Sequence, residues 1–160
     1  MLIIGWVYKY DSCYGISEGC LLLIKEIMKK NVITIDCDDT VFDACNKYRD
    51  YKVGCLVVTE HGSCVGIVTE RDLIERTICA RKNPERTKVK EIMTKNVKTV
   101  HALDKVEKAI EIMKTNNIKK LPVVVNEGIV GIITVTDISH ARPDLSKRFI
   151  ESWVKPVWKD

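Results

Sequence analysis

The sequence lacks any hydrophobic stretch long enough to cross a bilayer, which takes roughly 18 to 20 consecutive apolar residues. Its apolar opening, residues 1–8, has no basic start and no small-residue cleavage site, so it does not have the pattern of a secretory signal peptide. We therefore expect a cytoplasmic protein with no membrane partner.

The short motifs of common catalytic and metal sites are missing as well. The seven cysteines include no C-x-x-C pair, and none of the three histidines has metal-ligand spacing. The chain contains no G-x-x-x-x-G-K-S/T phosphate loop, no G-x-G-x-x-G and no G-x-S-x-G. We expect no enzyme activity and no bound metal. An odd cysteine count without a disulfide framework favours reduced thiols that pack in the core as small hydrophobes.

Length and composition predict a globular protein. The 160 residues are enough for one domain, or for two small ones that share a core. Apolar residues make up 46% and charged residues 30%, and the net charge is only +4. This balance suits anionic small molecules and argues against nucleic acid as a partner. Weak nucleic-acid binding through Lys25, Lys29, Lys30 and the basic residues of 81–90 is an alternative.

An internal repeat of 65 residues determines the expected architecture. Residues 24–73 align with residues 89–138 without a gap, and 18 of the 50 positions are identical. Each copy reads as a Lys-Glu-Ile-Met turn, a short extended piece, an amphipathic helix, two strands joined by a tight turn, and a second helix. One small sheet with helices on one side is marginal alone. We expect an α/β (α+β) protein whose two pseudo-symmetric sheets face each other and leave clefts at their seam.

The repeat divides the chain into segments. We expect an N-terminal extension of unknown role (1–19), a first domain (20–82), a polar linker (83–88), a second domain (89–142) and a C-terminal tail (143–160). In the tail, Leu145, Phe149 and Trp153 follow the spacing of one helical face. This helix either folds back onto the chain or docks on a second subunit.

The last strand of each copy ends in the same turn, which reads GIVTERD at 66–72 and GIITVTD at 131–137. A Thr thus stands three residues ahead of an Asp where a helix begins. A helix N-terminus favours negative charge and a carboxylate accepts two hydrogen bonds, which suits the phosphate and the ribose diol of a nucleotide. Thr-x-x-Asp is equally a capping box whose groups satisfy only their own helix. Both interpretations remain open at this point.

Taken together, these features resemble a tandem pair of cystathionine-β-synthase (CBS) domains, called a Bateman module. The resemblance covers residues 24 to about 142 and also includes the strand motifs VGCLVV at 53–58 and IKKLPVV at 118–124. It implies a regulatory module that needs no cofactor and binds an adenine nucleotide (AMP, ADP or ATP) or S-adenosylmethionine. It also implies a homodimer that signals to an unidentified effector protein. The alternative is a structural or interaction protein with unliganded clefts.

The resemblance implies ligand contacts as well. Asp72 and Asp137 would hold the ribose hydroxyls, and Thr69 and Thr134 would contact ribose or phosphate. The other implied ligand-binding residues are Ile33, Thr34, Cys55, Arg71, Lys98, Thr99, Lys120 and Pro122.

The two clefts are expected to differ in affinity, because the repeats place different cations at equivalent positions. Arg71 can bind a phosphate bidentately, whereas Lys120 would act as a point charge. The alternatives are that Arg71 pairs with Glu70 or Glu75 in solvent and that Lys120 caps a strand.

Overall fold

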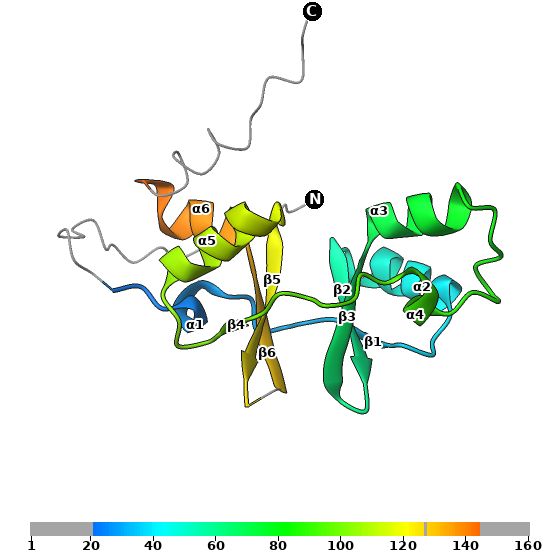
Figure 1. Cartoon of the computed structure of the whole chain (residues 1–160), viewed down its shortest axis with the longest axis horizontal. Coiled ribbons are helices and arrows are strands. Elements are labelled where there is room, and N and C mark those ends of the chain that lie inside the picture. Colours follow the sequence, from blue (N-terminus) through cyan, green and yellow to red (C-terminus); the bar gives the residue numbers. More distant parts are fainter. Residues whose placement is uncertain (1–20, 127, 145–160) are drawn as a thin grey trace, which may run out of the picture.

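The computed structural model describes residues 21–126 and 128–144 (Figure 1). The expected N-terminal extension and the tail helix from Leu145 onward lie outside the described residues. The elements of the first repeat are α1 (Ile24–Ile27), β1 (Thr34–Asp36), α2 (Val41–Tyr51), β2 (Cys55–Glu60), β3 (Ser63–Thr69), α3 (Glu70–Leu73) and a π-helical turn, η1 (Ile74–Ile78). Those of the second are α4 (Val89–Ile92), β4 (Val100–His101), α5 (Val106–Asn116), β5 (Lys120–Val125), β6 (Gly128–Thr134) and α6 (Val135–Ala141).

Each repeat builds one three-stranded sheet, with the orders β1-β2-β3 and β4-β5-β6. The first two strands of each sheet are parallel because a helix carries the chain back between them, and the last two form an antiparallel hairpin. The first hairpin closes through His61 and Gly62, whose φ angles of 48° and 83° are those of a tight turn with the twist of the strands. The expected α+β class is confirmed.

The two sheets lie next to each other at the centre of the molecule, with the helices on the outer flanks (Figure 1). Helices α2, α3 and α4 flank the first sheet, and α1, α5 and α6 flank the second. Strand β3 contacts β6 across the seam. The expectation of two pseudo-symmetric sheets that face each other is therefore confirmed. The longest described helices, α2 and α5, have 11 residues each, too few to span a membrane.

The two repeats exchange their entry turns. Ile24 of α1 is fully buried in the core of the second repeat, and Ile92 of α4 is fully buried in the core of the first. Backbone hydrogen bonds also join each entry turn to the other repeat: Ile24 N donates to the carbonyl oxygen of Asp104 (2.9 Å), and Val89 N donates to that of Asp39 (2.9 Å). Each hydrophobic core is therefore completed by a segment that the sequence assigns to the other copy.

The chain just after each entry turn lies directly on the last strand of the other repeat. Lys29 and Ile132 exchange two backbone hydrogen bonds of 2.9 Å, and an equivalent pair forms on β3. This close approach needs a glycine on β6. A Cβ at Gly131 would stand 2.5 Å from Met28 Sδ and 3.0 Å from the Lys29 carbonyl oxygen. The glycine that opens each repeated turn motif is thus explained by packing between the repeats.

Helix α2 begins with a reciprocal cap. Thr40 Oγ1 accepts a hydrogen bond from Asp43 N (3.1 Å), and the Asp43 carboxylate accepts one from Thr40 N (2.9 Å). These contacts satisfy two backbone groups that would otherwise have no partner in the helix.

The five cysteines among the described residues are free thiols. Cys37 is buried, as expected, but Cys45 and Cys79 are exposed, so the expectation that the cysteines are core residues is wrong for these two. Cys45 lies on the exposed face of α2, where the neighbouring Ala44 is the residue that enters the core, and Cys79 follows the end of η1.

Candidate functional site

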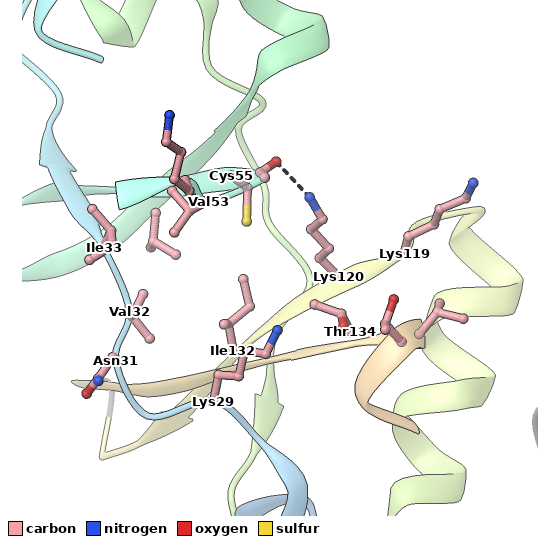
Figure 2. A pocket seen from close by; sticks show the side chains of 15 residues that line it. Lys29, Asn31, Val32, Ile33, Val53, Cys55, Lys119, Lys120, Ile132 and Thr134 are labelled. Atoms are coloured by element: carbon pink, nitrogen blue, oxygen red, sulfur yellow. Dashed lines mark hydrogen bonds between the residues drawn. The ribbon is translucent and has the colours of Figure 1, made fainter. Parts of the chain in front are cut away.

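A cavity of about 610 Å³ opens at the seam between the repeats (Figure 2). This volume lies within the roughly 300–1,000 Å³ of typical small-molecule sites. Its apolar wall combines side chains of both repeats, namely Val32, Ile33, Val53, Val57 and Ile132. The entry segment of the first repeat crosses beneath the second sheet here, so one cavity receives residues that are about 100 positions apart in the chain.

Four of the predicted site residues line this cavity. Ile33 and Cys55 come from the first repeat, and Lys120 and Thr134 come from the second. Lys120 Nζ donates a 2.7 Å hydrogen bond to the carbonyl oxygen of Gly54, so this side chain also ties the two halves together (Figure 2). An ammonium group has three donors, so this bond does not exhaust it.

The turn at the start of α6 places a carboxylate behind the cavity wall. Asp137 Oδ2 accepts hydrogen bonds from Thr134 N (2.9 Å) and Thr134 Oγ1 (2.6 Å), which is the capping box. Its other oxygen, Oδ1, lies 3.4 Å from the Nζ atom of Lys29, a residue that lines the cavity. The side chain of Asp137 is only 10% exposed. Capping therefore occupies one oxygen, and the other faces the cation at the cavity.

The same turn in the first repeat has a different partner. Asp72 repeats the cap with Thr69 at the same two distances, but its Oδ1 is 3.2 Å from Arg76 Nη2. Arg76 Nη1 donates in turn to the Ile92 carbonyl oxygen (2.7 Å), which holds the exchanged entry turn in place. The second repeat has Ala141 at the position of Arg76. The two acids are therefore equivalent in sequence and not in environment.

Eight predicted residues do not line this cavity: Thr34, Thr69, Arg71, Asp72, Lys98, Thr99, Pro122 and Asp137. The Arg71 side chain is 84% exposed, and its Nε donates to Glu75 Oε1 at 2.6 Å. This is the alternative in which Arg71 pairs with a glutamate in solvent. Thr34, Lys98 and Thr99 are exposed, and Pro122 is buried in β5. Ligand contacts by these residues stay predictions.

Sequence reasoning missed several cavity residues, above all Lys29, Lys52 and Thr136. A signal for the two lysines was present, because the second repeat has Thr94 and Asn117 at their positions. The comparison of the repeats that singles out Arg71 and Lys120 singles out these two lysines as well. The sequence pattern does not show, however, that the entry turn packs on the other repeat, which is what brings Lys29 to the cavity.

The cavity wall is positively charged. Burial raises the pKa of the Cys55 thiol, and the charges of Lys120 and Lys29 offset this only in part. The thiol is therefore mainly protonated at neutral pH, and it contributes no negative charge beside the lysines. Figure 2 shows Cys55 and Lys120 reaching toward the same space from the two repeats.

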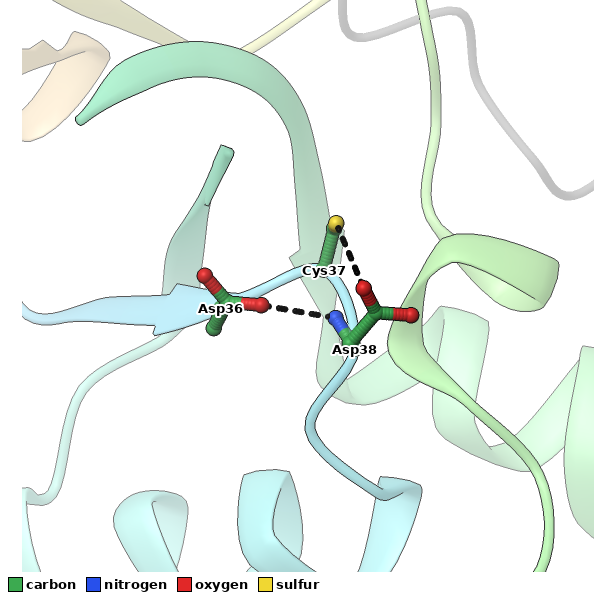
Figure 3. Close-up of side chains that lie close together, drawn as sticks. All are labelled: Asp36, Cys37 and Asp38. Carbon is green, nitrogen blue, oxygen red and sulfur yellow. Dashed lines mark hydrogen bonds between the residues drawn. The ribbon is translucent and has the colours of Figure 1, made fainter. Parts of the chain in front are cut away.

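A second cluster of polar groups lies outside the cavity. Asp36, Cys37 and Asp38 have donor atoms within 4.8 Å of one another at the end of β1 (Figure 3). These groups already have partners in the chain, because Asp36 Oδ1 accepts from Asp38 N (2.9 Å) and Asp38 Oδ1 pairs with Lys90 Nζ (2.7 Å). Cys37 Sγ donates weakly to Glu60 at 3.6 Å. Burial, followed by the nearby carboxylates, raises the pKa of Cys37. The cluster is best described as a hydrogen-bonded surface turn.

Comparisons with known proteins identify the architecture. The family model described as "CBS domain" matches residues 24–78 and again residues 89–144. Inosine-5'-monophosphate dehydrogenase of Methanocaldococcus jannaschii is 38% identical over 120 residues, which are 73% of this chain and 23% of that enzyme. A CBS domain protein of unknown function from Thermoplasma acidophilum superposes with a TM-score of 0.74 at 28% identity, covering 85% of this chain and 78% of that one.

A hexameric CBS-CP12 protein from bloom-forming cyanobacteria gives a TM-score of 0.68 at 32% identity, with 74% of this chain and 66% of that one covered. The chain spans only 23% to 63% of the length of three curated relatives that it matches.

Proposed function

We propose that this chain, which belongs to the CBS-domain family, is a regulatory module that binds an adenosine-containing ligand between its two repeats and signals to an effector protein. The proposal rests on one observation. An apolar wall, a hydroxyl and several ammonium groups, drawn from both repeats, line one cavity of suitable size, and the carboxylate of Asp137 lies just behind its wall, 3.4 Å from the ammonium group of Lys29.

The ligand's parts match different regions of the cavity. The adenine base would pack against the apolar wall around Ile33 and Val53. The ribose hydroxyls would donate to Asp137 Oδ1, which lies 3.4 Å from Lys29 Nζ. A carboxylate oxygen accepts more than one hydrogen bond, so this ion pair leaves acceptor capacity on the atom. Phosphate groups would meet the ammonium groups of Lys29 and Lys120.

Regulation would follow from the position of the cavity. A ligand that contacts both repeats binds more tightly when the two cavity walls are close together than when they are apart. The population therefore shifts toward the closed arrangement, by an amount set by the difference in affinity for the closed and open arrangements. The Lys120–Gly54 hydrogen bond crosses the seam, and the Lys29–Asp137 pair joins the entry segment of the first repeat to the second repeat, so an occupied cavity would affect both contacts. The module would act through this shift and would catalyse no reaction.

Titration calorimetry tests the proposal on protein freed of bound ligand, with AMP, ADP, ATP and S-adenosylmethionine. We expect binding of at least one of these, and weaker binding by Asp137→Ala. Asp72→Ala is the matched control, because Asp72 has the same cap but faces Arg76. Equal loss of binding in both variants would contradict the assignment of this cavity. No heat with any ligand, and no rise in melting temperature, would favour the alternative of an interaction protein with unliganded clefts.

Self-association is part of the proposal, and the hexameric cyanobacterial neighbour supports it. Ile74 and Ile78, at the two ends of the π-helical turn η1, are 58% and 62% exposed. A homodimer through this segment would cover them. Ile78→Glu should convert a dimer to monomers in sedimentation analysis, whereas a wild-type monomer at micromolar concentration would remove this part of the proposal.

A further inference from the structure

The charge of the cavity lining is one-sided. Four lysines line it, two from the first repeat (Lys29 and Lys52) and two from the second (Lys119 and Lys120). Among the residues that the structure describes, no aspartate or glutamate lines the cavity. The carboxylate of Asp137 lies behind the wall and is engaged by its own cap and by Lys29.

Two of these lysines approach the cavity from the side of the second sheet, Lys29 on the entry segment that pairs with β6 and Lys120 at the start of β5. In Figure 2 the side chains of Lys29 and Lys120 reach toward the cavity, while Lys119 extends away from it. The ammonium group of Lys29 lies 3.4 Å from Asp137 Oδ1 on a segment whose backbone pairs with Ile132, and that of Lys120 donates a hydrogen bond to Gly54. Both cations are therefore positioned before a ligand arrives, which lowers the entropy lost when an anion binds between them.

The repeats show that these charges are particular to this cavity. Under the 65-residue offset, Lys29 corresponds to Thr94 and Lys52 to Asn117. Lys119 and Lys120 correspond to Gly54 and Cys55, which lie in the same cavity, so these positions straddle the pseudo-twofold axis. Each of the four lysines therefore stands where the equivalent position of the other repeat has an uncharged residue.

From this arrangement we propose that the cavity selects nucleotides by their phosphate chain, binding the triphosphate and diphosphate more tightly than the monophosphate and excluding S-adenosylmethionine. This inference rests on the proposed function, since it takes the adenosine site as given and names its ligand class. A longer phosphate chain carries more negative charge and can reach both Lys29 and Lys120. S-adenosylmethionine has a sulfonium, an ammonium and a carboxylate group, and its net positive charge is unfavourable beside the lysines.

The test compares adenosine, AMP, ADP, ATP and S-adenosylmethionine by calorimetry in metal-free buffer at low and high salt. We expect affinity to rise about three- to fivefold with each added phosphate, the gain typical of partly exposed ion pairs. That gain should shrink at high salt, where exposed charges are screened, while adenosine binding should not change. S-adenosylmethionine should bind at least tenfold more weakly than ATP.

Charge-neutral variants locate the effect. Lys120→Gln and Lys29→Gln should each lower the ratio of ATP affinity to adenosine affinity by about three- to fivefold, because only ATP carries the phosphates that these ammonium groups bind. Lys108→Gln is the control, because Lys108 pairs with Asp104 on α5 and does not line the cavity. Melting curves identify a variant that fails to fold, and the other lysine variant then carries the test.

The outcomes separate the two proposals. If adenosine and ATP bind equally, or if S-adenosylmethionine binds as tightly as ATP, the phosphate inference is wrong and the adenosine site stands. If none of the five compounds binds, the proposed function fails, and this inference fails with it.

Discussion

Replacing Gly131 by alanine should disturb stability and ligand binding together, because this residue lies beneath the segment that carries Lys29 into the cavity. The new Cβ would stand 2.5 Å from Met28 Sδ and 3.0 Å from the Lys29 carbonyl oxygen. The Met28 thioether can adopt another rotamer, but the Lys29 carbonyl cannot move freely, because both the N–H and the C=O of Lys29 are hydrogen-bonded to the backbone of Ile132. The entry segment must therefore move away from β6.

The size of the effect follows from two opposing contributions. Inserting a methyl group into a packed interface typically costs about 1–3 kcal/mol. Gly131 does not have a positive φ, so the substitution also gains about 0.4–1 kcal/mol by restricting the unfolded chain. A net loss of roughly 1–2 kcal/mol remains. For a domain of this size, each kcal/mol lowers the melting temperature by about 2–4 °C.

Gly66→Ala is the matched control at the equivalent position of the first repeat. Its Cβ would meet the Met93 sulfur and stand 3.2 Å from the Thr94 carbonyl oxygen, so a similar loss of stability is expected. Thr94 does not line the cavity, however. Only Gly131→Ala should therefore also weaken nucleotide binding, by up to about fivefold if one lysine contact is lost.

Chemical denaturation and calorimetry on the same preparations give both quantities. A Gly131→Ala protein that is more stable than wild type would show that the entry segment does not press on β6. Wild-type affinity in a destabilised Gly131→Ala protein would show that Lys29 makes no contribution to binding.

Three further predictions address the cores, the pH dependence and the cavity. Ile24→Ala should cost about 2–5 kcal/mol of stability and reduce the protection of backbone amides from hydrogen exchange in β5 and β6 of the other repeat. Ile92→Ala should reduce this protection in β2 and β3. Protection lost only in each residue's own repeat would contradict the exchange of entry turns. Thr40→Ala should cost about 1 kcal/mol at pH 7 in urea unfolding. Hydrogen bonds from Thr40 lower the pKa of Asp43 in the folded protein. The stability that the carboxylate contributes is therefore present above the pKa of the unfolded state, about 3.9, and is lost as the pH falls through the lower pKa of the folded state. A stability difference between wild type and variant that does not shrink on acidification would contradict this. Saturating nucleotide should slow alkylation of the Cys55 thiol, measured by peptide mass spectrometry, and an unchanged rate at Cys55 would place the ligand elsewhere.

The sequence was sufficient to predict the order of elements, because hydrophobic periodicity and the 65-residue repeat report which face of each segment is buried. It was not sufficient to predict which core buries that face. The pattern around Ile24 and Ile92 is the same whether an entry turn packs on its own repeat or on the other one. The π-helical turn at Ile74–Ile78 was not predicted either, since apolar spacing does not distinguish it from an ordinary helix.

The candidate site shows the same division. Ile33, Cys55, Lys120 and Thr134 were predicted, and the structure brings them to one cavity. Lys29 was missed, because it reaches the cavity only through the exchange. The different environments of the two acids were also missed, although the residue that separates them, Arg76 against Ala141, could be read from the aligned repeats.

The exchange of entry turns also determines how the molecule can be divided. A break in the backbone between residues 79 and 88 would leave two fragments that each hold part of the other's interior, so the nicked protein should stay assembled without a covalent connection. One half produced alone would have an empty groove where its partner's isoleucine belongs. A second copy of the same half carries the piece that fits this groove, which indicates how a single ancestral unit could have been stable in pairs before the gene was duplicated.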